Sequence, residues 1–221
     1  MTTAPPRARR LRLAITLAAV CAVVVTGIVL VAREQRDAPT SAAPGPAAVV
    51  RPDSHRLDAP EGARVTLVEF LDFECEACAA MYPVVERLRE EYRDRVTFVV
   101  RYFPVPSHFN AERAARAVEA AARQGRFEQM YQQMFRTQAG WGERRVPLDE
   151  VFRGFARELG LDMAAFDADY ADPRVGERVR ADFEDGLALG VRGTPTFFVD
   201  GEPIAPNGYE SLAEALDAAL R

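Results

Sequence analysis

Stretches of apolar residues separated by polar turns predict a small α/β domain in the second part of the chain. The run VTLVEFLDF at 65–73 is almost wholly apolar and predicts a buried strand. A helical pattern follows over about 75–93, and 95–103 predicts a second strand. Helical spacing then continues from 110 to about 190. A β-hairpin over 194–204 and a helix over about 209–220 complete the predicted order of β, α, β, helical block, β-hairpin, α.

The first 56 residues have a different pattern. Residues 13–32 form an uncharged apolar run, long enough to span the roughly 30 Å hydrocarbon core of a bilayer. Four arginines precede the run, so the positive-inside rule predicts a cytoplasmic basic tail at 1–12 and a single-pass transmembrane anchor at 13–32. Residues 33–56 are rich in alanine and proline and predict an extended linker before a domain that begins at Leu57.

An uncleaved anchor is favoured over a signal peptide, because the apolar run exceeds the usual core of about 7–15 residues. Cleavage at Ala32 or within Ala42-Ala43 is the alternative. Charge changes at the same point in the chain: residues 1–36 carry a net charge of +5 and the rest carries −10, which together give −5. An acidic exported domain argues against a nucleic-acid partner.

The sequence CEAC at 75–78 lies at the predicted strand-to-helix turn. The free N–H groups and the dipole of a helix N-terminus favour a thiolate, which is the form that attacks disulfides. A CxxC pair can also be half of a zinc site. However, Cys21 is the only other cysteine and lies in the apolar run, and His55 and His108 lack metal-binding spacing. We therefore predict redox chemistry at Cys75 and Cys78, with no metal and no cofactor.

Four local features together resemble the DsbA-like branch of the thioredoxin superfamily. They are DFECEAC at 72–78, FPVPSHFNA at 103–111, GVRGTPTFF at 190–198, and Glu69 six residues before Cys75. The resemblance extends over about 57–221. It implies an α/β thioredoxin fold with a helical subdomain, about 107–190, inserted between the second and third core strands. It also implies a cis peptide bond between Thr194 and Pro195, a form that is realistic only before proline.

Candidate roles follow from position and from this resemblance. Cys75, at the helix N-terminus, is the expected nucleophile, and Cys78, one turn deeper, is the expected resolving thiol. Glu69 is either a buried carboxyl with a raised pKa that moves the Cys78 proton, or a solvent-facing strand residue. The resemblance places Pro195 and Thr194 beside Cys75, where the Thr194 backbone would bind an extended substrate chain. The alternative for Pro195 is a simple strand-initiating role.

Two glutamates flank Cys75, whereas the best-known strong oxidants of this family carry Pro-His between their cysteines. Glu74 and Glu76 could each raise the Cys75 pKa by up to about 0.4–0.9 unit, which predicts a weaker oxidant. His108 follows the second predicted strand, where a surface or helix-capping role is expected.

These features predict a thiol-disulfide oxidoreductase in a bacterial cell membrane, with its catalytic domain outside the cytoplasm. It would donate the Cys75–Cys78 disulfide to reduced cysteine-containing exported proteins. The resemblance implies a quinone-linked membrane partner, DsbB-like or vitamin K epoxide reductase-like, that reoxidises it. One alternative is a disulfide reductase or isomerase fed by a transmembrane electron donor. The other is a non-catalytic binding or assembly protein on a thioredoxin-like scaffold.

Overall fold

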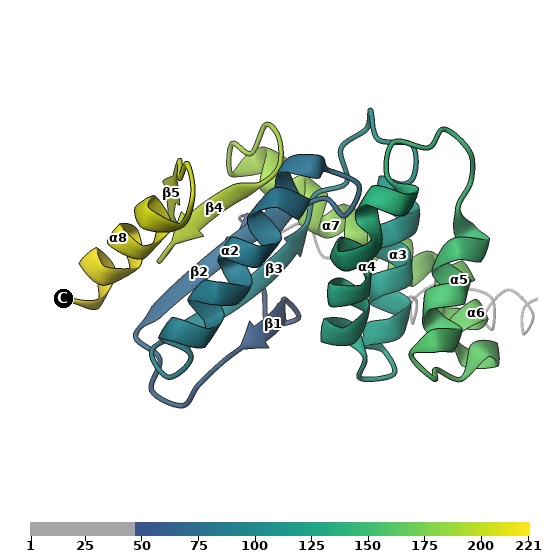
Figure 1. The fold of residues 1–221 in the computed structure, drawn as a ribbon, viewed down its shortest axis with the longest axis horizontal. Helices are drawn as coiled ribbons and strands as arrows, with labels where there is room; N and C mark the ends of the chain where they lie inside the picture. Colours follow the sequence, from purple (N-terminus) through teal and green to yellow (C-terminus); the bar gives the residue numbers. More distant parts are fainter. Residues whose placement is uncertain (1–46) are drawn as a thin grey trace, which may run out of the picture. The chain divides into compact units, whose positions relative to one another are not determined.

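A five-stranded sheet forms the centre of residues 47–221, the part of the chain that this computed structural model describes (Figure 1). The strands are β1 (His55–Asp58), β2 (Val65–Leu71), β3 (Val96–Tyr102), β4 (Thr196–Val199) and β5 (Glu202–Ile204). The helices are α2 (Glu76–Tyr92), α3 (Ala111–Ala122), α4 (Phe127–Trp141), α5 (Asp149–Glu158), α6 (Met163–Ala171), α7 (Pro173–Ala188) and α8 (Tyr209–Leu220). The strand order is β1-β3-β2-β4-β5, so β2 is the central strand.

The central strand is mostly apolar because both faces of the sheet are covered. β2 is parallel to β3 and antiparallel to β4. Leu67 and Leu71 belong to the larger core that includes residues of α2 and α8, whereas Val68 and Phe70 belong to a second core on the opposite face. In Figure 1, α2 lies across one face of the sheet and α7 lies behind it. The strand that leads to the two cysteines is therefore packed on both faces.

Five helices, α3 to α7, connect β3 to β4. The α/β fold and the helical insertion between the second and third core strands are confirmed, with the inserted helices running from Ala111 to Ala188. α7 returns to the sheet and packs against β3. The rest of the block forms a separate helical layer beside the sheet (Figure 1).

The start of the folded unit differs from the prediction. The unit begins at Ala47, whereas the sequence predicts a linker up to residue 56. Val49 and Val50 pack against the second core, and β1 pairs antiparallel with β3, with His55 opposite Val100. The residues that 47–56 contact lie far away in the sequence, so the local composition of this segment gives no sign that it is folded.

The predicted anchor at 13–32 and Cys21 lie outside the described residues. Within 47–221, no helix is both long enough and apolar enough to cross a membrane.

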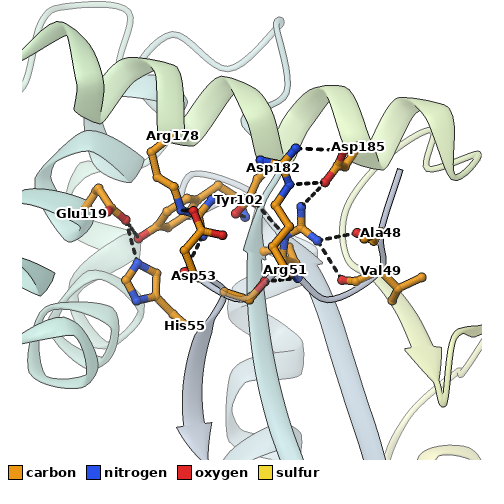
Figure 2. A network of polar contacts seen from close by, with 12 residues as sticks. Ala48, Val49, Arg51, Asp53, His55, Tyr102, Glu119, Arg178, Asp182 and Asp185 are labelled. Carbon is orange, nitrogen blue, oxygen red and sulfur yellow. Dashed lines mark hydrogen bonds and ion pairs between the residues drawn. The ribbon is translucent and has the colours of Figure 1, made fainter. Parts of the chain in front are cut away.

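A buried arginine fixes the start of this unit. Arg101 is fully buried in β3, and it donates hydrogen bonds to Asp182 and Asp185 of α7, each at 2.7 Å. Its remaining terminal nitrogen donates to the carbonyl oxygens of Ala48 at 2.7 Å and Val49 at 2.8 Å (Figure 2). A buried charge is tolerated only when it is paired and hydrogen-bonded, and these four partners provide that environment. Arg101 thus ties residues 48–49 to both the sheet and α7.

Candidate functional site

Cys75 and Cys78 lie where β2 leads into α2. Cys75 is the N-cap residue of α2, and its N–H donates to the carbonyl oxygen of Asp72 at 3.2 Å. Both cysteines are free thiols. Cys75 is 7% exposed, whereas Cys78 is completely buried one turn further along the helix. An external disulfide or thiol can therefore reach Cys75 first.

The two thiols have opposite pKa shifts. The pKa of Cys75 is lowered to about 5, chiefly because the Cys78 thiol hydrogen-bonds to its sulfur. Burial opposes this shift, and Thr194 and the backbone N–H groups of Cys78 and Ala77 support it. Burial raises the pKa of Cys78 well above its usual value, and the hydrogen bond to Cys75 and the charge of Glu69 add to this rise. Near neutral pH the site therefore holds a thiolate at Cys75 and a proton at Cys78.

The two flanking glutamates lie in different environments. Glu74 is 1% exposed, and its carboxylate accepts the backbone N–H of Asn110 at 2.5 Å. Glu76 is exposed in the first turn of α2. Neither glutamate is among the main causes of the Cys75 pKa shift. The net shift at Cys75 is downward because short-range hydrogen bonds outweigh the opposing effects.

Glu69 lies on the central strand, between Val100 of β3 and Phe197 of β4. It is 4% exposed, so the solvent-facing alternative is wrong. Its pKa is raised to about 8, first by burial and then by the charges of Cys75 and Glu86. A cavity of about 10 Å³ borders Glu69, which is about the volume that one water needs. Glu69 is therefore able to carry a proton close to Cys78 near neutral pH.

The fold brings Thr194 and Pro195 to the cysteines, 119 residues away in sequence from Cys75. The Thr194-Pro195 peptide bond is cis, as the resemblance implies. It immediately precedes β4, and the Cys75 sulfur lies 3.4 Å from the Thr194 carbonyl oxygen. The reactive sulfur thus lies beside a stretch of backbone at the end of the sheet.

The sequence does not predict a pair formed by Asp72 and His108. His108 Nδ1 lies 2.7 Å from Asp72 Oδ2, which also accepts the Val105 N–H at 2.9 Å. The other Asp72 oxygen accepts the Glu74 N–H at 2.8 Å. His108 is neither a free surface residue nor a helix cap, since its side chain is 19% exposed and Asn110 is the N-cap of α3. The one sequence feature that could have indicated this pair is Asp72, an acidic residue directly after a buried strand.

No cluster of three metal-ligating side chains occurs among residues 47–221.

Comparison with known proteins gives a consistent fold. A family model described as thioredoxin matches residues 60–218. A thioredoxin-like oxidoreductase from Silicibacter pomeroyi superimposes with a TM-score of 0.67 at 28% identity, covering 80% of this chain and 98% of that one. Wolbachia pipientis alpha-DsbA1 gives a TM-score of 0.67 at 17% identity, over 77% of this chain and 92% of its own. Bacillus subtilis BdbD gives 0.64 at 17% identity, over 74% and 91%.

Curated relatives carry a different name. A Na(+)/H(+) antiporter NhaA from Herminiimonas arsenicoxydans is 39% identical over 174 residues, which cover 78% of this chain and 27% of the relative. NhaA 1 from Mycolicibacterium gilvum is 37% identical over 167 residues, covering 74% and 25%. The chain thus spans about a quarter of the length of these relatives, and their name describes much longer proteins.

Proposed function

Because the chain belongs to the thioredoxin family and has a DsbA-like fold, we propose that it is a thiol-disulfide oxidoreductase that donates disulfides to exported proteins. The observation that carries the proposal is the opposite pKa shift of its two thiols, to about 5 at Cys75 and well upward at Cys78. A stabilised thiolate favours the reduced form of the protein, which makes its disulfide a better oxidant.

In the proposed reaction the oxidised protein carries a Cys75–Cys78 bond. A substrate thiolate attacks the Cys75 sulfur, so that a mixed disulfide forms and the Cys75–Cys78 bond breaks. The electron pair goes to Cys78, which takes up a proton, and Glu69 is placed to supply it. A second substrate thiolate then attacks the substrate sulfur of the mixed disulfide. Cys75 leaves as a thiolate, the substrate is oxidised by two electrons, and the protein is reduced by two.

The substrate chain is proposed to lie along the backbone at Thr194 and Pro195. This segment precedes β4 and contacts the Cys75 sulfur through the Thr194 carbonyl oxygen. An extended peptide beside the end of a sheet is a common recognition mode, in which backbone contacts tolerate many sequences. Such tolerance suits an enzyme with many substrates.

We propose that residues 13–32 anchor the protein in the bacterial cell membrane, with the folded unit outside the cytoplasm. The apolar run and the arginines before it support this orientation. An oxidising compartment favours disulfide donation over reduction. Continued turnover then needs a membrane partner that reoxidises the Cys75–Cys78 pair, of the quinone-linked DsbB-like or vitamin K epoxide reductase-like kind.

The deciding measurement is the reduction potential of Cys75–Cys78 on residues 47–221, equilibrated in glutathione buffers. A value of about −120 to −180 mV would support disulfide donation. A value near about −270 mV would instead assign the protein as a reductase. Absence of a reversible couple, with unchanged partner binding by a Cys75→Ala variant, would favour a non-catalytic scaffold.

A further inference from the structure

The dipeptide between the two cysteines, Glu76-Ala77, carries no positive charge. A titratable imidazole, that of His108, is nevertheless close enough to Cys75 for the charges of the two groups to interact. His108 lies in the loop between β3 and α3, and its Nδ1 is 2.7 Å from Asp72 Oδ2. The backbone carbonyl of the same Asp72 accepts the Cys75 N–H at 3.2 Å. One residue thus connects the imidazole to the turn that carries the reactive sulfur.

The charges around His108 favour its protonated form. It lines a cavity of about 240 Å³ together with Glu74, Glu143 and Arg145. Together with Asp72, the two glutamates place three carboxylates around the imidazole, whereas Arg145 supplies one guanidinium. His108 also borders a second groove, whose four charged residues have no net charge: Glu112, Arg113, Arg180 and Glu184.

The titration of His108 agrees with this geometry. Burial disfavours the imidazolium, but the hydrogen bond and charge of Asp72 and the charges of Cys75 and Glu74 outweigh it and raise the His108 pKa. Coupling between two titrating groups is reciprocal. If a Cys75 thiolate favours a charged His108, a charged His108 favours the Cys75 thiolate by the same free energy.

We propose that His108, held by Asp72, is the electrostatic partner of the Cys75 thiolate and makes the Cys75–Cys78 disulfide more oxidising. The proposal rests on the thiol-disulfide exchange proposed above, and it adds a residue from a different loop to that chemistry. This stabilisation of the Cys75 thiolate is lost as His108 loses its proton with rising pH. A single charge across a partly solvated site changes a pKa by about 0.5–1 unit, which is about a three- to tenfold change in the thiol dissociation constant.

The test compares His108→Gln, which is neutral, with His108→Lys, which keeps a positive charge. Both are made in the full chain, in detergent, with Cys21→Ser so that Cys21 does not titrate. The pKa of Cys75 is measured from the ultraviolet absorbance of its thiolate and from its rate of alkylation. We expect His108→Gln to raise the Cys75 pKa by about 0.5–1 unit and His108→Lys to stay within about 0.3 unit of the unmodified residue.

Arg145→Gln is the matched control, since Arg145 lines the same cavity but has no hydrogen bond to Asp72. It should shift the Cys75 pKa by less than His108→Gln does. Three results would overturn the proposal: an unchanged pKa in His108→Gln, an equal rise in His108→Lys, or an equal rise in Arg145→Gln. The reduction potential of the unmodified protein separates this result from the proposed function. A protein without a reversible couple would refute the function, while the pKa comparison would still decide whether His108 stabilises the Cys75 thiolate.

Discussion

Replacing Cys75 with alanine should remove much of the stability that the reduced protein gains as the pH rises from 6 to 8. The Cys75 pKa is about 5 in the folded state and about 8.5 in an unfolded chain. Because the folded pKa is the lower one, the stabilisation is fully present above the unfolded pKa and is lost as the pH falls towards 5. Cys78 keeps its proton across this range, since its pKa is raised.

The full shift would add about 2.5 kcal/mol to the free energy of unfolding between pH 6 and pH 8. Solvent at the partly accessible sulfur screens the interactions that cause the shift, and a shift half as large would add about 1.5 kcal/mol. Glu69 acts in the opposite direction, because its pKa is raised to about 8 and its contribution is lost as the pH rises. Most of the pH dependence due to Glu69 is common to the unmodified protein and Cys75→Ala, so it cancels when one unfolding free energy is subtracted from the other.

The assay is urea unfolding of both reduced proteins, kept reduced by a phosphine, at several values between pH 6 and pH 8. The quantity of interest is the difference between the two slopes of unfolding free energy against pH, so the constant effect of truncating the side chain is irrelevant. We expect the unmodified protein to gain about 1.5–2.5 kcal/mol more than Cys75→Ala over this range. A difference below about 0.3 kcal/mol would show that Cys75 stays protonated in the fold, and the reasoning about the thiolate would fail.

Three other predictions concern buried groups. Glu69→Gln should slow thiol-disulfide exchange near neutral pH by about tenfold or more in single-turnover experiments, because the proton carrier is lost; an unchanged rate would remove Glu69 from the mechanism. Arg101→Met should lower the unfolding free energy in urea by about 3 kcal/mol, since it leaves buried aspartates and carbonyls short of a partner. Gly186→Ala should destabilise by about 1–3 kcal/mol, because the new Cβ would lie 2.7 Å from the ring of Phe103. In its matched control, Gly154→Ala in α5, the new Cβ would meet only the Arg157 side chain, at 4.0 Å, and the change should stabilise by about 0.5–1 kcal/mol.

The sequence predicts those parts of the fold that depend on local patterns. β2, α2 and β3 have strong apolar periodicity, and their observed bounds lie close to the predicted ones. Glu69 could be singled out because an acid inside an apolar strand is unusual, and its burial gives that signal a physical basis. β1 could not be predicted in this way, because HRLD contains one apolar residue and forms a strand through backbone pairing with β3.

The parts of the site that were missed depend on contacts between distant loops. Asp72 and His108 are 36 residues apart, and nothing in their spacing indicates that they meet. Glu74 and Asn110 are the same distance apart, and their hydrogen bond removes from solvent a carboxylate that the sequence places beside Cys75. Propensity and periodicity describe single elements, whereas these contacts are set by how two loops meet at the end of the sheet.

The contacts of Arg101 with residues 48 and 49 also determine where the chain tolerates proteolysis. A cut ahead of Ala47 leaves every hydrogen bond of Arg101 in place and releases a complete folded unit. A cut after Val49 lets its two carbonyl partners leave, and a buried guanidinium then lacks half of its acceptors. A shed form of this protein that keeps its stability should therefore begin at or before Ala47.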